Sequence, residues 1–259
     1  MSYRDILVYL DPTSASAARL DIAVRIALTE GAYLTGIDAS TDDAFLGEWR
    51  EAAAGIEGGF HAVLKANNVA GEFHVAGSRG RRLLEDFAIP ADLVIAPSPS
   101  PEVRRLIHSA LPDEVIKEAG APVLTVPTDW SGGACGKNVV IAWNGDREAR
   151  RAIHDALPLL KRAQKVTIFV FSRADTDLRA AARRLVEHLY RHGVTAQVSD
   201  WTNTGDVTAV EALFASLDTQ TADLLVAGAF GHSRVFESLF GSVSLDLLRQ
   251  PVLPVLMSH

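Results

Sequence analysis

The sequence predicts an α/β protein made of two copies of one doubly wound, mainly parallel domain. Short apolar runs alternate with longer amphipathic stretches along the 259 residues, which is the pattern of strands followed by helices. The short runs are apolar at nearly every position, as in a parallel sheet that helices cover on both faces. Because crossovers between parallel strands are right-handed, a doubly wound sheet is the expected arrangement.

Recurring landmarks indicate the duplication. Three segments of the first half return in the same order in the second half, at a nearly constant displacement. The matched pairs are 6–11 with 139–144, 91–96 with 222–227, and 122–124 with 254–256. Two copies are too few for a solenoid, so we expect two packed globular units.

A linker separates the copies. Residues 127–136 break both periodicities and are rich in Gly, Ser, Pro and Thr. We therefore predict domains at 1–128 and 137–259.

The second copy shows the alternation clearly. It predicts strands at 139–142, 166–171, 195–201, 224–227 and 252–257, and helices at 147–162, 177–192, 207–217 and 243–249. Pro251 and Pro254 predict that the last strand lies at an edge.

Composition excludes several classes of protein. No apolar run approaches the roughly 18 residues of a membrane span, and the net charge of −7 argues against a general affinity for nucleic acid or anionic membrane. Cys135 is the only cysteine, so no intrachain disulfide can form. The strand pattern begins within the first residues and leaves no room for a signal peptide, which predicts a cytoplasmic protein.

A glycine-rich loop after the fourth strand of the second copy carries the functional signal. Its pattern is Gly228, two residues, Gly231, nine residues, then Gly241-Ser242 at the start of the last predicted helix. Glycine lets the backbone approach a ligand closely, and a helix start offers free N–H groups to an anion. Ser244 adds a hydroxyl, so the loop predicts a phosphate-binding nest. The alternative is a tight turn and a helix cap without a ligand.

The other phosphate-binding loops are missing. The chain has neither Gly-x-Gly-x-x-Gly after the first strand nor Gly-Lys-Ser/Thr. In the first copy, the corresponding loop begins Ala96-Pro-Ser-Pro-Ser-Pro101, where prolines replace flexible residues that could donate N–H groups. Asp11, at the end of its first strand, more plausibly caps the following helix than binds a ligand. We expect no ordinary nucleotide site in the first copy.

With its Gly-x2-Gly-x9-Gly-Ser motif and Pro254-Val-Leu beyond, the chain resembles the universal stress protein family in its tandem form. The resemblance covers nearly the whole chain, once per copy. It implies a five-stranded Rossmann-like sheet in each domain and two domains packed as a pseudo-two-fold pair. It also implies a site for an adenine nucleotide, ATP with or without Mg²⁺, in the second domain. The implied site residues are Ala142, Asn144, Phe171, Gly228, Gly231, His232, Ser233, Gly241, Ser242, Val243 and Ser244.

Two residues depart from the family pattern. Asn144 stands where the family usually has Asp, and Phe171 stands where a smaller aliphatic residue is more usual. An amide can still read an adenine edge, because it both donates and accepts hydrogen bonds. Phe171 could stack on the base or crowd it.

The resemblance implies a stress-response or signalling protein that acts by binding an adenine nucleotide. No nucleophile, base and acid stand out as a catalytic set. A slow ATP hydrolase, with His232 or a serine positioning water, is one alternative, and a scaffold that has lost nucleotide binding is another. Whether whole chains also pair as a homodimer stays open.

His188 and His192 form a separate signal. Their i, i+4 spacing on a predicted helix is one that zinc sites use. No glutamate lies between them in the metalloprotease pattern, and a solvated helix face explains the pair more simply, so we prefer that interpretation.

Overall fold

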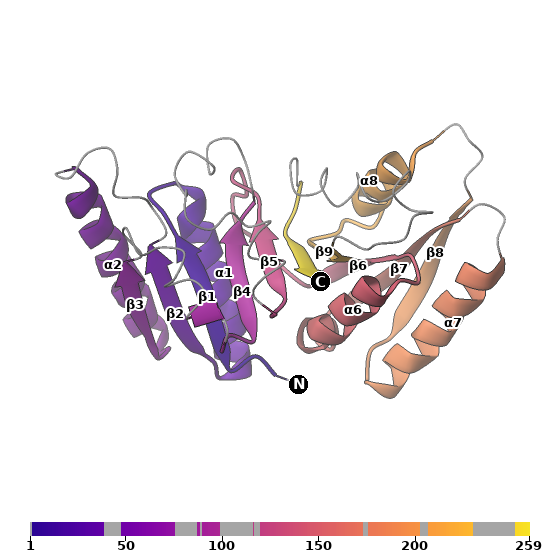
Figure 1. Cartoon of the computed structure of the whole chain (residues 1–259), viewed down its shortest axis with the longest axis horizontal. Coiled ribbons are helices and arrows are strands. Elements are labelled where there is room, and N and C mark those ends of the chain that lie inside the picture. The colour runs from indigo at the N-terminus through magenta and orange to yellow at the C-terminus, as the bar shows by residue number, and fades with distance from the viewer. Residues whose placement is uncertain are drawn as a thin grey trace. The chain divides into compact units, whose positions relative to one another are not determined.

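The computed structural model describes residues 2–38, 48–75, 87–88, 90–98, 116, 120–172, 176–202, 207–229 and 252–259. The chain divides into two compact units, Ser2–Gly133 and Ala134–His259, called here the N-terminal and the C-terminal unit. Figure 1 shows the elements of both. Among the described helices, none is long and apolar enough to cross a membrane.

The N-terminal unit alternates strands and helices, as expected. Its elements are β1 (Asp5–Leu10), α1 (Ala15–Glu30), β2 (Tyr33–Asp38), α2 (Glu48–Asn67), β3 (Gly71–Val75), β4 (Leu93–Pro97) and β5 (Val123–Val126). The strand order is β3-β2-β1-β4-β5, and these neighbours pair in parallel.

The C-terminal unit repeats this arrangement. Its elements are β6 (Asn138–Trp143), α6 (Arg147–Leu160), β7 (Lys165–Ser172), α7 (Thr176–Arg191), β8 (Ala196–Thr202), α8 (Ala209–Thr219), β9 (Leu224–Gly228) and β10 (Val255–Ser258). The order β8-β7-β6-β9-β10 matches β3-β2-β1-β4-β5 strand for strand, again in parallel. The predicted pair of doubly wound parallel domains is therefore confirmed.

One aspartate anchors the amino ends of the strands in each unit. Asp92 accepts hydrogen bonds from the backbone N–H groups of Arg4 and Asp5 at 2.6 and 3.1 Å. Asp223 accepts from Gly136, Lys137 and Asn138 at 2.9 to 3.1 Å. These contacts explain why Ala-Asp-Leu recurs before the fourth strand of each copy. A carboxylate there satisfies strand-start N–H groups that have no ladder partner.

Helices cover both faces of the C-terminal sheet. In Figure 1, α8 lies on the opposite side of this sheet from α6 and α7, as right-handed crossovers require. β6 and β9 are almost fully buried between these layers, which accounts for their apolar sequences.

Two predicted element starts differ from the observed ones by two or more residues. Helix α8 begins at Ala209 rather than at 207, because Thr208 and Glu211 form a capping box that fixes the start. The last strand begins at Val255 rather than at 252, because Pro254 has no N–H for the ladder. The predicted helix at 243–249 lies outside the described residues.

Candidate functional site

The reversal point of the C-terminal sheet lies between β6 and β9. From β6 the chain moves outward through β7 to β8, and it then returns to place β9 and β10 on the other side of β6. In doubly wound sheets, ligands bind at the carboxyl ends of the strands beside such a point. Ala142 lies near the carboxyl end of β6, Asn144 directly follows that strand, and Gly228 is the last residue of β9. The topology therefore brings these three sequence-predicted residues to one edge of the sheet.

Asn144 forms the turn that starts helix α6. Its Oδ1 accepts a hydrogen bond from the N–H of Asp146 at 3.0 Å, and its Nδ2 donates to Asp146 Oδ2 at 3.1 Å. The amide is therefore engaged with its own turn, as expected of an Asn at this position. Burial, followed by the nearby Glu148, raises the pKa of Asp146, while Arg150 opposes that shift.

Gly228 brings β9 into close contact with the first turn of α6. A Cβ at this position would lie 2.5 Å from the backbone N of Ala149 and 2.6 Å from the carbonyl carbon of Glu148. The glycine is thus required for helix packing, whether or not it also approaches a ligand.

Phe171 is a buried wall residue rather than an open stacking surface. Its side chain is only 5% exposed. It shares a face of β7 with Phe169, whose ring lies 6.4 Å from that of Trp201 on the neighbouring strand. A ligand at this edge would meet Phe171 as part of the apolar lining.

Three further residues with polar side-chain atoms lie at the same edge, and sequence reasoning missed the two serines among them. Trp143 Nε1, Ser172 Oγ and Ser258 Oγ, near the ends of β6, β7 and β10, are buried and have no hydrogen-bond partner among the described residues. Strand pairing puts all three side chains on the α6–α7 side of the sheet. Buried polar atoms normally find a partner, so this edge has donors and acceptors to offer. A polar residue closing an apolar strand is the sequence signal that could have indicated the serines.

The N-terminal unit fills the corresponding positions with larger residues. Tyr9, fully buried on β1, stands at the position of Ala142, which is half-buried. Pro97, at the end of β4, stands at the position of Gly228. The third difference is Arg19 of α1, whose counterpart in α6 is Ala152.

Arg19 is part of a buried ion pair. Its side chain and that of Asp11 are 0% and 1% exposed, and the guanidinium contacts the Asp11 carboxylate directly. Arg19 Nε also donates to the carbonyl oxygen of Tyr9 at 3.1 Å. Burial lowers the pKa of Arg19, and Asp11 opposes that shift. The prediction that Asp11 caps the helix is wrong, because Ser14 is the N-cap of α1; Asp11 instead accepts a hydrogen bond from the Thr13 N–H at 2.8 Å, in the turn before the helix.

Most of the predicted glycine loop lies outside the described residues. This holds for Gly231, His232, Ser233, Gly241, Ser242, Val243 and Ser244. Their assignment to phosphate and ribose stays a prediction. Of the loop, the structure places Gly228 and Ala229, the first residues after the apolar run of β9.

No family model and no curated protein matches the chain, but solved structures match its fold. A universal stress protein from Archaeoglobus fulgidus DSM 4304 aligns with TM-score 0.76 and 17% identity, over 98% of this chain and 97% of that one. A protein from Pseudomonas aeruginosa UCBPP-PA14, provisionally assigned to the universal stress proteins, aligns with TM-score 0.61 and 16% identity, over 99% and 93%. A functionally unknown protein from Pseudomonas aeruginosa PAO1 gives 0.63 and 15%, over 99% and 92%. At these identities the likeness concerns architecture. Both halves together follow the course of a complete universal stress protein, and the chain has the tandem universal stress protein fold.

Proposed function

We propose that the C-terminal unit binds an adenine nucleotide at the carboxyl ends of β6, β7 and β9, and that the protein acts through this binding. The observation that carries the proposal is the contrast between equivalent positions. Ala142 and Ala152 are small where the N-terminal unit has the buried Tyr9 and Arg19. The smaller residues are in the C-terminal unit, the copy in which the Gly-x2-Gly-x9-Gly-Ser pattern begins at the end of β9.

The polar groups at this edge support the same proposal. A nucleotide presents hydrogen-bonding groups on its base and ribose, and Trp143 Nε1 and Ser172 Oγ are buried there without a described partner. The N–H groups of the glycine loop would receive the phosphates, with or without Mg²⁺. Acidic residues at the first turn of α6, Asp146 and Glu148, are unfavourable neighbours for phosphates, so we expect the phosphates to extend toward the glycine loop rather than toward this turn.

Calorimetry with ATP, ADP and AMP tests the proposal directly. We expect saturable binding of one equivalent by the full chain and its loss in Ala142→Tyr, which imports the residue of the N-terminal unit. The control is Pro97→Gly in the N-terminal unit, which imports the residue that the C-terminal unit has at the equivalent position and should leave affinity unchanged. Absence of binding tighter than about 1 mM, which corresponds to about −4 kcal/mol, would refute the proposal.

A second measurement identifies the base. Chromatography of the small molecules released when the purified protein is denatured should yield an adenine nucleotide, provided that affinity is high enough for co-purification. A guanine nucleotide in its place would retain the site and overturn the assignment of the base.

A further inference from the structure

Three histidines lie in contact on the C-terminal unit. His154 belongs to α6, His188 lies in the last turn of α7, and His192 follows directly after the end of that helix at Arg191. The ring centroids of His154 and His188 are 5.3 Å apart, and those of His188 and His192 are 4.6 Å apart. The i, i+4 spacing in the sequence already indicated that His188 and His192 are neighbours, and the contact between α6 and α7 adds His154.

His188 occupies the centre of this histidine cluster. Its Nε2 is buried and has no hydrogen-bond partner among the described residues. His154 and His192 on either side are exposed to solvent. Burying a ring nitrogen without a hydrogen-bond partner costs free energy. A ligand bound to this nitrogen would offset that desolvation cost.

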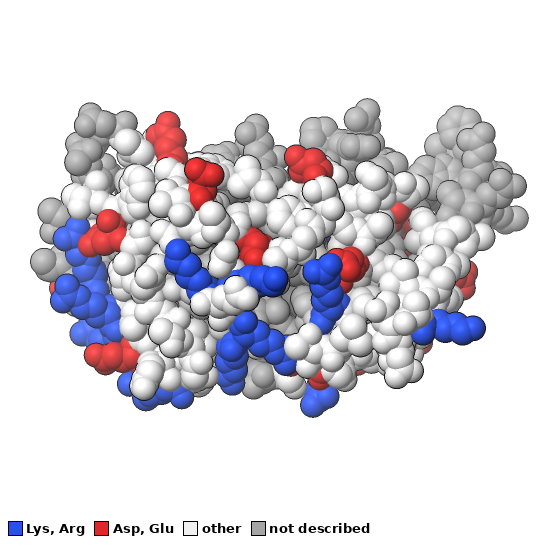
Figure 2. All heavy atoms as spheres, turned by 180° about the vertical axis from the view of Figure 1, so that it is seen from behind, with Lys and Arg blue, Asp and Glu red and all other residues white. Residues whose placement is uncertain are grey.

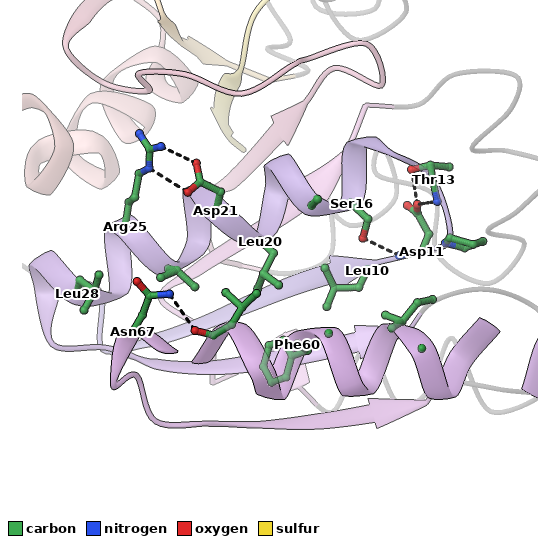
Figure 3. Close-up of a pocket in the computed structure, with 17 residues that line it drawn as sticks. Leu10, Asp11, Thr13, Ser16, Leu20, Asp21, Arg25, Leu28, Phe60 and Asn67 are labelled. Atoms are coloured by element: carbon green, nitrogen blue, oxygen red, sulfur yellow. Dashed lines mark hydrogen bonds and ion pairs between the residues drawn. The ribbon is translucent and has the colours of Figure 1, made fainter. Parts of the chain in front are cut away.

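The fold does not require histidines here. In the N-terminal unit, the equivalent positions are Asp21, Val63 and Asn67, which line a groove of about 710 Å³ between α1 and α2 (Figure 3). Matching turns fix this equivalence, because Val69 N–H donates to Leu64 O at 3.0 Å as Val194 N–H does to Leu189 O at 2.9 Å.

The residues of that groove satisfy one another without a ligand. Asp21 pairs with Arg25 at 2.9 Å, and Asn67 Nδ2 donates to Val63 O at 2.9 Å. The same pair of helices therefore packs in the other unit without any imidazole. The histidine cluster is a property of the C-terminal copy alone.

We propose that His188 and His192 chelate a divalent transition-metal ion of the Zn²⁺, Ni²⁺ and Cu²⁺ class, with His154 as a third ligand from the neighbouring helix. Neutral imidazole suits these ions. Metal–nitrogen bonds of about 2.0–2.1 Å bring two bound ring nitrogens to about 3.4 Å from each other in a tetrahedral site, which rings already in contact reach by small side-chain rotations.

The rotations are necessary. No group of three His, Cys, Asp or Glu side chains within the described ranges already has the arrangement of a metal site. Since His154 and His192 are exposed, their rings can turn toward the nitrogen of His188 without disturbing the core. Water would complete the coordination shell. A metal held in this way would link α6 to α7.

Titration of the untagged full chain with ZnCl₂ tests the proposal. We expect one equivalent to bind, with affinity at least about tenfold weaker in His188→Gln and in His192→Gln, because each removes one ligand of the chelate. The control is His61→Gln, which removes a 52% exposed histidine on α2 and should have no effect. Zinc binding that is absent, or that survives in both cluster variants, overturns the proposal.

Electron paramagnetic resonance with CuCl₂ provides a readout that packing alone would not give. The wild-type spectrum should show hyperfine coupling to imidazole nitrogens, and His188→Gln should lose it. In His154→Gln we expect copper still bound, with one coupled nitrogen fewer. An unchanged spectrum in that variant overturns the role of His154, and a wild-type spectrum without imidazole coupling overturns the site.

Discussion

The two units agree at the amino ends of their strands and differ at the carboxyl ends. At the amino ends, Asp92 and Asp223 make equivalent hydrogen bonds to the backbone. At the carboxyl ends, the N-terminal unit has a buried tyrosine and a buried ion pair where the C-terminal unit has two alanines. The difference indicates that the two copies kept the same contacts at the amino ends of their strands and diverged at the carboxyl ends, where doubly wound sheets bind ligands.

The largest expected effect comes from breaking the ion pair of the N-terminal unit. Arg19→Ala leaves the Asp11 carboxylate buried without its partner, which should cost about 3–5 kcal/mol of unfolding free energy. The double variant Asp11→Asn with Arg19→Ala recreates the pair of residues in the C-terminal unit and should recover most of that loss. Urea unfolding followed by circular dichroism measures both. A double variant no more stable than the single one would show that packing, not charge, is the main contribution of Arg19.

Gly228→Ala tests the close contact in the C-terminal unit. The new methyl group would lie 2.5 Å from a backbone nitrogen of α6, so β9 and α6 must separate. We expect a loss of about 1–3 kcal/mol, the usual range for overpacking. Pro97→Ala at the equivalent position is the control, with an expected loss below about 1 kcal/mol. Similar thermal unfolding of the two variants would contradict the difference that we infer between the units.

Much of the fold follows from local sequence pattern. Apolar runs placed β6 and β9 within about one residue of their observed ends, because strands buried on both faces leave a continuous signal. The start of α8 was missed because Thr208 and Glu211 satisfy each other across the first turn, a signature that apolar periodicity does not contain.

The candidate site divides in a similar way. Asn144 and Gly228 could be assigned to one edge because topology alone joins the ends of adjacent strands. The roles of Trp143 and Arg19 could not be predicted, because burial depends on what packs from other elements. His154 was missed for the same reason, since its partners are on another helix.

The shared amino-end anchors should respond alike. Asp92→Ala and Asp223→Ala each remove the carboxylate that accepts strand-start N–H groups. We expect each variant to lose about 1 kcal/mol of unfolding free energy. This value is at the low end for hydrogen bonds to charged groups, because the carboxylates are partly exposed. Differential scanning calorimetry of the two variants measures the costs. A several-fold difference between them would show that the likeness in geometry does not extend to energy.

The smallest expected effect is a pH dependence in the C-terminal unit. Burial raises the pKa of Asp223, although three backbone N–H donors oppose the shift. A raised pKa in the folded state means that the folded protein binds a proton at Asp223 more tightly than the unfolded chain does. The wild type should therefore gain stability relative to Asp223→Asn as the pH falls from about 7 through the raised pKa toward the ordinary value of about 4. Urea unfolding of both proteins across this range tests the sign, and a relative loss on acidification would contradict it.

Surface charge bears on the choice of partners. On the face shown in Figure 2, basic and acidic side chains lie among one another. Among the described residues, this face therefore offers no broad basic surface of the kind that binds a long polyanion, and the net charge of −7 argues in the same direction.

The ion pair of Asp11 and Arg19 also constrains how this protein can evolve. Changing either residue alone strands an opposite charge inside the unit, so each single step toward the composition of the other copy passes through a poorly folded intermediate. Two coordinated substitutions are needed to convert the ion pair into the residues of the other copy. The ion pair therefore makes the difference between the two units difficult to reverse by single substitutions.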